Sequence, residues 1–165
     1  MIICGLPGVG KTTLAYELSP LVKAVVLSTD KIRKELIRKP TYSVRERRFV
    51  FNIFLLIAKY LHNCEVSCIL DATFNRQRSR DQVKEVLGLG DEQIHIVECV
   101  CLEEIVISRL LERKDSYSDA NLYVYRKMKK IFEPVVGPHI VVNTTESPRK
   151  NAEFVATLIK GKKEK

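Results

Sequence analysis

A glycine-rich stretch near the start of the chain constrains the fold more than any other feature. Residues 5–12 have the sequence Gly-Leu-Pro-Gly-Val-Gly-Lys-Thr, with the spacing G-x-x-x-x-G-K-[ST] of a phosphate-binding loop. Glycines in such a loop adopt positive φ angles, so successive N–H groups can point at an anion. The apolar residues 1–4 predict a buried strand before the loop. The residues from Lys11 onward predict a helix whose N-terminus attracts phosphate.

The last residues of this loop have separate expected roles. Lys11 supplies a mobile ammonium group for the β- and γ-phosphates, and the hydroxyl of Thr12 can ligate Mg²⁺. We therefore predict that the chain binds ATP and Mg²⁺. The loop residues expected to bind the nucleotide are Gly8, Val9, Gly10, Lys11, Thr12 and Thr13.

Length and composition predict one globular domain over residues 1–165. A chain of this size with 45% apolar and 29% charged residues can bury a full sheet between helices. Its apolar runs are too short to span a membrane, and the run at residues 1–4 is too short for a signal peptide, so we expect a cytoplasmic protein. The five cysteines are odd in number and lack zinc-site spacing, which favours reduced thiols in the core.

The chain is basic, with a formal net charge of +8. An enzyme that handles phosphates needs such charge, and so does a protein that binds nucleic acid, and composition does not separate the two. Apart from the C-terminal tail, the positive charge is concentrated in the segments 33–39, 45–48, 76–80, 109–114 and 126–130.

Short apolar runs alternate with helical patterns along the whole chain, which predicts an α/β fold with a parallel sheet and right-handed crossovers. We expect Ser19-Pro20 to end the first helix, and Ser147-Pro148 to begin the last one. The five runs predicted to form the strands are residues 1–4, 24–28, 66–71, 94–100 and 139–143.

Two aspartates follow predicted strands, at the edge of the sheet where ligands gather in open α/β folds. Asp30 follows the second strand and lies about one helical turn before Arg33; it either has a chemical role or caps the N-terminus of a helix beginning at Lys31. Asp71 ends the third strand, the usual place for a residue that holds Mg²⁺ or its water ligands.

Two helical segments are candidates for binding the second substrate and for closing the site. Along the helix predicted for residues 43–62, a polar stripe containing Arg45, Arg48 and Asn52 is either solvated surface or the wall of an acceptor pocket. The helix predicted for residues 103–113 ends in Arg109 and Arg113, before a short polar segment. These arginines indicate a phosphate-closing lid, or else a basic helix end favoured by the helix dipole.

Together these motifs resemble the small P-loop kinases, which are AAA-like ATP-binding kinases. The group is typified by the kinase domain of polynucleotide kinase, the zeta toxins and the kinase of seryl-tRNA for selenocysteine synthesis. The resemblance covers nearly the whole chain, and it implies a three-layer P-loop NTPase fold of the nucleoside-kinase type. It rests on the ordered motifs at residues 5–15, 28–33 and 70–74 with Arg80, and then on Arg109, Arg113, Asp119-Ala120 and Phe132-Glu133-Pro134.

The resemblance also implies roles for individual residues. Asp30 resembles the general base that takes the proton of an acceptor hydroxyl, and Arg33 resembles a clamp on the acceptor. Asp71 resembles a residue that holds either metal water or acceptor. Arg113 resembles the lid arginine that stabilises the transferring phosphoryl group, with Arg109 supporting it. The implied organisation is an acceptor-side helical region at about residues 31–63 and a short lid at about 109–121.

Three functions are therefore compared. The first is an ATP-dependent kinase that phosphorylates a hydroxyl on a nucleic-acid end, a nucleoside or another small molecule. The second is a nucleoside monophosphate kinase, in which Arg33, Arg76 and Arg80 would bind the acceptor's phosphate. The third is a non-catalytic, nucleotide-dependent RNA-binding module; it is disfavoured because the aromatic residues follow helical patterns typical of a core and leave no stacking platform. These aromatic residues are Phe49, Phe51, Phe54, Phe132 and Phe154.

Overall fold

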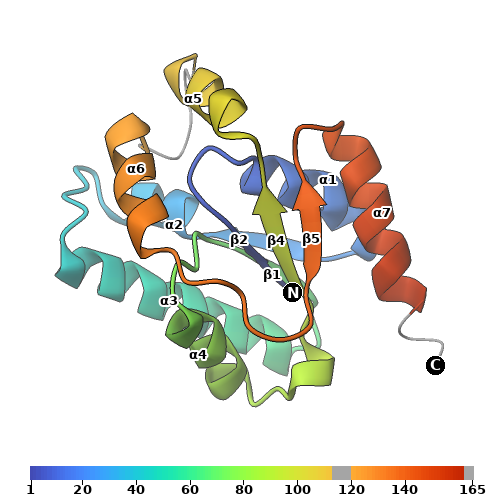
Figure 1. Cartoon of the computed structure of the whole chain (residues 1–165). Helices are drawn as coiled ribbons and strands as arrows, with labels where there is room; N and C mark the ends of the chain where they lie inside the picture. Colours follow the sequence, from blue (N-terminus) through green and yellow to red (C-terminus); the bar gives the residue numbers. More distant parts are fainter. Residues whose placement is uncertain (113–119, 162–165) are drawn as a thin grey trace.

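A five-stranded parallel sheet forms the centre of the protein (Figure 1). The computed structural model describes residues 1–112 and 120–161. Neighbouring strands follow the order β2-β3-β1-β4-β5, and every pairing is parallel, which confirms the predicted sheet. The strands are β1 (Ile2–Cys4), β2 (Val25–Ser28), β3 (Cys68–Asp71), β4 (Ile96–Val100) and β5 (Ile140–Asn143).

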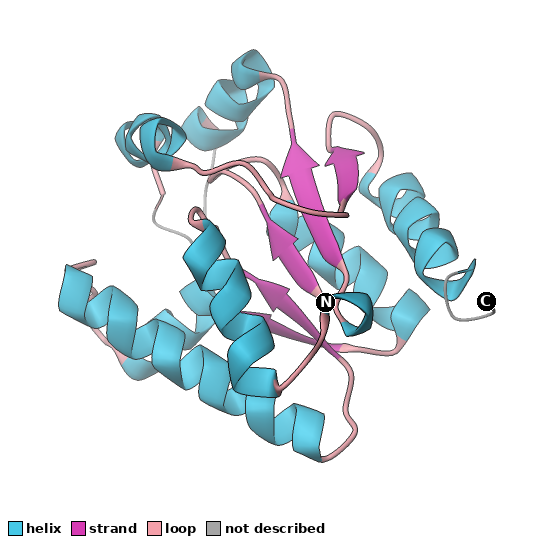
Figure 2. Cartoon of the chain, turned by 60° about the horizontal axis from the view of Figure 1, so that its bottom comes forward, coloured by secondary structure: helices cyan, strands magenta, loops and turns pink. Residues whose placement is uncertain are grey.

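Helices cover both faces of this sheet, and the three-layer α/β class is confirmed (Figure 2). Side chains alternate across a strand, so β1 contributes to two cores: Ile3 packs on the side of α1 and α7, whereas Ile2 and Cys4 pack on the side of α3 and α4. The helices are α1 (Lys11–Val22), α2 (Thr29–Leu36), α3 (Val44–Asn63), α4 (Gln77–Leu87), α5 (Glu103–Leu111), α6 (Leu122–Ile131) and α7 (Pro148–Gly161), with a 3-10 turn at Asp91–Gln93.

The first helix does not end at Ser19-Pro20, contrary to the sequence prediction. Pro20 lies inside α1, which continues to Val22 and closes at Lys23 in the left-handed conformation (φ 52°). The helix tolerates the proline because it lies in the last turn, where only one backbone hydrogen bond is lost. The N–H of Lys23 donates to the carbonyl of Ser19 and restores the helical hydrogen bonding directly after it.

The helix after β2 begins earlier than the sequence suggested. Ser28 is the N-cap residue, and α2 starts at Thr29, so the interpretation of Asp30 as the cap is wrong. Asp30 lies in the first turn, where its negative charge is favoured by the helix dipole. Its carboxylate therefore does not satisfy the first backbone donors of the helix through an N-cap bond.

Two composition-based interpretations hold only in part. All five cysteines are free, and burial raises the pKa of the Cys4 and Cys99 thiols to about 12, but Cys64 after α3 is exposed. Among the aromatic residues, Phe54 is buried, whereas Phe49 and Phe154 are about half exposed.

None of the helices in residues 1–112 and 120–161 combines the length and the apolar character needed to span a membrane.

Candidate functional site

The phosphate-binding loop has the backbone that its glycines predicted. Gly5, Gly8 and Gly10 all have positive φ angles, and Gly10 forms the left-handed N-cap of α1. Gly5 is required for a second reason, because a Cβ atom there would lie 2.5 Å from the carbonyl oxygen of Cys99 in β4. The loop is thus held tightly against the sheet, and its N–H groups and the start of α1 form a site for phosphate.

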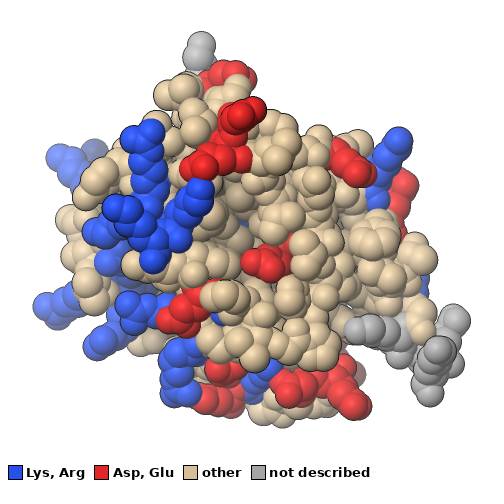
Figure 3. Space-filling view, viewed as in Figure 1, with Lys and Arg blue, Asp and Glu red and all other residues tan. Residues whose placement is uncertain are grey.

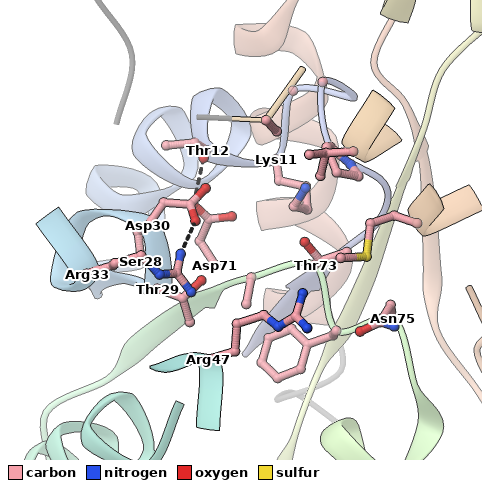
Figure 4. Close-up of a pocket in the computed structure, with 18 of the residues that line it drawn as sticks. Lys11, Thr12, Ser28, Thr29, Asp30, Arg33, Arg47, Asp71, Thr73 and Asn75 are labelled. Carbon is pink, nitrogen blue, oxygen red and sulfur yellow. Dashed lines mark hydrogen bonds and ion pairs between the residues drawn. The ribbon is translucent and has the colours of Figure 1, made fainter. Parts of the chain in front are cut away.

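The two polar side chains at the end of the loop point toward different partners (Figure 4). Lys11 Nζ donates a 2.9 Å hydrogen bond across the loop to the carbonyl of Leu6. Thr12 Oγ1 donates a 2.7 Å hydrogen bond to Asp71 Oδ2, at the end of β3. Thr12 and Asp71 were predicted independently from the sequence, and the parallel sheet brings them into contact.

Asp71 is only 3% exposed, and its oxygen atoms suit a hard cation. Burial raises the pKa of this carboxyl, and nearby Asp30 acts in the same direction; Lys11 and hydrogen bonds from Thr12 and Ser28 oppose the shift. A divalent cation beside this buried carboxylate and the neighbouring hydroxyl would stabilise the ionised form of the carboxylate. The residues present therefore fit Mg²⁺ held by Thr12, Asp71 and bound phosphates.

Asp30 is the end of a chain of charged groups. Its Oδ1 lies 3.0 Å from Nη1 of Arg33, and Nε of Arg33 lies 3.1 Å from Oε1 of Glu46 on α3. The Arg33 guanidinium also stacks on the ring of Tyr42 at 4.7 Å. Burial opposes ionisation of Glu46, but hydrogen bonds from the N–H and hydroxyl of Thr41 lower its pKa, with help from Tyr42 and Arg33. This chain holds the Asp30 carboxylate in a defined position.

On the β4 and β5 side of the loop, two residues hold the phosphate site together. Arg109 of α5 donates to the carbonyl of Thr144 at 2.7 Å, and it lies beside Gly10, whose added Cβ would be 3.5 Å from Arg109 Nη1. Thr144 follows β5, and its hydroxyl donates to the carbonyl of Val9. Arg109 was predicted from the sequence, but Thr144 was missed. The available signal for Thr144 was its place directly after a predicted strand.

One cavity of about 1170 Å³ joins the two sides of the phosphate loop. The walls on the β2 and β3 side come from α3, from the segment after β3 and from α6. The basic character of α6 was noted from the sequence, but its place in the wall was not predicted. Figure 4 shows Arg47 of α3 reaching toward Thr73 and Asn75. The residues on this side include Tyr42, Arg47, Arg48, Phe51, Phe74, Asn75, Arg76, Lys127, Met128 and Ile131.

Arg80, predicted to contact the substrate, is fully buried instead. Its guanidinium donates to the carbonyls of Phe74 (2.7 Å), Glu133 (3.0 Å) and Pro134 (2.7 Å). It therefore ties the loop after β3 to the segment after α6 and has no surface facing the cavity. Phe74 adopts a positive φ of 45°, and the bond from Arg80 holds it in this strained conformation.

The remaining predicted site residues fall into three groups. Gly8, Gly10, Lys11, Thr12, Thr13, Asp30, Arg33, Asp71, Arg76 and Arg109 all line the one cavity. Val9 contributes its carbonyl to Thr144, while its side chain is buried in the core. Arg113 and most of the predicted lid lie outside the described residues.

Comparison with known sequences assigns the chain to a domain family. Residues 1–135 match the AAA_33 family model, described as an AAA domain. Uncharacterized proteins of Mycobacterium tuberculosis and Mycobacterium bovis are 28% identical over 131 residues, which cover 72% of this chain. The matched part is 26% of each relative, so the chain spans about a quarter of the length of these curated relatives.

Comparison with solved structures gives the same fold. A sugar kinase from Janibacter sp. HTCC2649 has a TM-score of 0.74 at 17% identity, covering 96% of this chain and 92% of that chain. The APS kinase CysC of Mycobacterium tuberculosis, solved with AMPPNP and APS, has a TM-score of 0.73 at 18% identity, covering 96% of both chains. A gluconokinase from Sinorhizobium meliloti 1021 has a TM-score of 0.68 at 13% identity, covering 96% and 91%. The chain therefore belongs to the AAA_33 domain family and has the fold of the small P-loop kinases.

Proposed function

We propose that the protein is an ATP-dependent kinase that transfers the γ-phosphate to a hydroxyl group, with Asp30 as the general base. The observation that carries this proposal is the different exposure of the two carboxylates in the cavity. The Asp71 residue is 3% exposed and accepts a hydrogen bond from Thr12, whereas the Asp30 side chain is 37% exposed and faces the cavity. The second carboxylate is therefore much more accessible to an incoming acceptor.

The proposed step has a simple balance of bonds. The acceptor oxygen forms a bond to the γ-phosphorus of ATP while the bond from that phosphorus to the β–γ bridging oxygen breaks, and ADP leaves. The hydroxyl proton passes to the carboxylate of Asp30, which then releases it to solvent. Lys11 and the N–H groups of the loop stabilise the negative charge on the phosphates, and Arg109 supports the loop from the α5 side.

When bound, Mg²⁺ would neutralise part of the negative charge on the phosphates. Thr12 and Asp71 are the residues proposed to hold it. Arg33 holds Asp30 in position through the 3.0 Å ion pair, so its proposed role is to orient the base rather than to clamp the acceptor directly.

A nucleoside monophosphate kinase is the second candidate, because the cavity is rich in arginine. Its acceptor is already an anion and needs no base. Two of the three arginines expected to bind that acceptor have other partners: Arg80 is buried on backbone carbonyls, and Arg33 is 6% exposed between Asp30 and Glu46. These contacts favour the hydroxyl acceptor.

Transfer of label from γ-labelled ATP tests the proposal. The acceptors are 5′-hydroxyl RNA and DNA, nucleosides, simple sugars and nucleoside monophosphates, and Lys11→Met is the inactive control. Label on a hydroxyl acceptor, absent with Lys11→Met, would support the proposal. Label on monophosphates alone would favour the second candidate, and ATP binding with neither transfer nor hydrolysis would favour a non-catalytic module.

A further inference from the structure

The acceptor side of the cavity carries more positive charge than a hydroxyl group needs. We infer that the acceptor is a phosphate ester: besides the hydroxyl that is phosphorylated, it carries a separate phosphate that binds among Arg47, Arg48, Arg76 and Lys127, here named the cationic wall. This inference rests on the proposed kinase function and adds a substrate class to it.

The cationic wall is assembled from three separate elements. Arg47 and Arg48 come from α3, Arg76 is the N-cap residue of α4, and Lys127 comes from α6. All four line the same cavity as the phosphate loop. In Figure 3, Lys and Arg gather on the side of the molecule where α6 and the start of α3 lie. All four residues are exposed, and segments far apart in the sequence thus contribute positive charge to one cavity.

The cationic wall has no carboxylate partner within the part of the chain that the structure describes, where no ion pair or hydrogen bond is recorded for any of its four side chains. Other cations of this region are paired: Arg33 with Asp30 and Glu46, and Arg78 with Glu85. Charges that line a cavity without partners lower the free energy of a bound anion.

The carboxylates of the cavity do not neutralise this wall. Asp71 accepts a hydrogen bond from Thr12, and Asp30 is paired with Arg33. Glu146 follows β5, whereas the wall is built on the β2 and β3 side of the sheet. Arginine provides a planar set of donors that matches the oxygens of phosphate and carboxylate groups, and three of the four cations are arginine. Several positive charges in one cavity favour a phosphate over a single carboxylate, because the phosphate carries more negative charge.

An apolar surface lies beside the cationic wall. Phe51 and Phe74 meet edge to face at 5.9 Å, and both line the cavity with Ile131 and Met128. The carbon skeleton of the acceptor would rest on this surface while its phosphate meets the wall. A neutral sugar would leave the charges unused, whereas a nucleoside phosphate, a 5′-hydroxyl oligonucleotide or a sugar phosphate would use both features.

Matched acceptors test the inference directly. Adenosine is compared with adenosine 3′-monophosphate, glucose with glucose 6-phosphate, and a 5′-hydroxyl dinucleotide is added to separate nucleic-acid ends from mononucleotides. We expect kcat/KM to be about tenfold or more higher for the phosphorylated member of a pair, and this preference to weaken with salt. Equal turnover of both members of every pair would overturn the inference.

Two variants on one helix identify the responsible charges. Arg47→Gln should reduce the preference for the phosphate ester about tenfold through a higher acceptor KM, with the KM for ATP unchanged. Arg45→Gln is the matched control, because Arg45 lies on the same helix but does not line the cavity. Equal effects of the two variants would contradict a local site.

A binding measurement separates this inference from the proposed function. Equilibrium binding of adenosine and of adenosine 3′-monophosphate is measured on the full chain, with and without Arg47→Gln, so no catalysis is needed. If transfer fails but the phosphate ester still binds more tightly and depends on Arg47, the kinase proposal fails and the phosphate site stands. If transfer occurs but binding shows no such preference, the phosphate site is rejected alone.

Discussion

On the β4 and β5 side of the phosphate loop, the contacts that hold the cavity together go to backbone atoms, whereas on the β2 and β3 side the wall consists of charged and aromatic side chains. Arg109 and Thr144 bond to carbonyl groups of Thr144, Val9 and Val100. The other wall gathers side chains from α3, α4 and α6. The first arrangement suits a nucleotide common to many enzymes, and the second can vary with the acceptor. Substitutions on the first side should therefore change the KM for ATP, and substitutions on the second side should change the KM for the acceptor.

The largest effect on stability is expected for Arg80, which lies on the acceptor side. Arg80→Met leaves the carbonyls of Phe74, Glu133 and Pro134 without their donor, so we expect the free energy of unfolding to fall by about 3 kcal/mol. The acceptor KM should also rise more than the KM for ATP. Urea unfolding measures the stability, with Arg78→Met as the control on the same helix, since that side chain is 73% exposed and should change stability by less than about 0.5 kcal/mol. Equal stability of the two variants would contradict the proposed stabilising role of the Arg80 hydrogen bonds.

Thr144 tests the nucleotide side, where a substitution should change the KM for ATP rather than the KM for the acceptor. Thr144→Val keeps the shape of the side chain but removes the donor to Val9 and Val100, and we expect a loss of about 1 to 2 kcal/mol in the free energy of unfolding. The KM for ATP should rise while the acceptor KM stays the same. Thr145→Val serves as the neighbouring control, and a larger effect on the acceptor than on ATP would show that the two sides are not separable in this way.

Asp71, at the end of β3, has the smallest expected effect on stability. Burial raises its pKa, so the folded chain holds this proton more tightly than the unfolded chain does. Above the ordinary value of 3.8, the wild type therefore loses stability as the pH rises through the raised pKa. Asp71→Asn should remove this loss, so the variant should be more stable than the wild type near pH 7 and their difference should shrink at acidic pH.

Urea unfolding at several pH values measures this difference in the free energy of unfolding. The same measurement with Mg²⁺-ATP present tests whether Asp71 holds the metal. The wild type should be stabilised by Mg²⁺-ATP much more than Asp71→Asn, because the variant lacks the carboxylate proposed to hold the metal. A variant that is less stable than the wild type at neutral pH would contradict the stated cost of burying this charge.

The same division explains what the sequence could predict. The phosphate loop is a local motif with fixed spacing, and Asp30 and Asp71 follow strands whose ends meet at one edge, so these residues were found without the structure. The five-stranded sheet followed from the alternation of apolar runs. Local patterns were enough because the neighbours that matter lie nearby in the sequence or at equivalent strand ends.

The acceptor wall could not be predicted in the same way, since it depends on which helix faces lie together in space. Arg80 and Arg76 belong to one basic run, yet one is buried on carbonyls and the other lines the cavity. Lys127 and Met128 showed no motif, and their place depends on how α6 packs beside the loop after β3, where Glu133 N–H donates to the carbonyl of Asn75 at 2.8 Å. Tertiary contacts of this kind leave no short-range signal.

Asp30→Asn provides the most direct test of the central claim that Asp30 accepts a proton from a hydroxyl acceptor. Steady-state kinetics of γ-phosphate transfer would compare this variant with the wild type on a hydroxyl acceptor. The account predicts that kcat falls about 10²- to 10⁴-fold while the KM for ATP changes little. A variant that keeps full turnover with every hydroxyl acceptor would contradict the claim and leave Asp30 only its structural ion pair with Arg33.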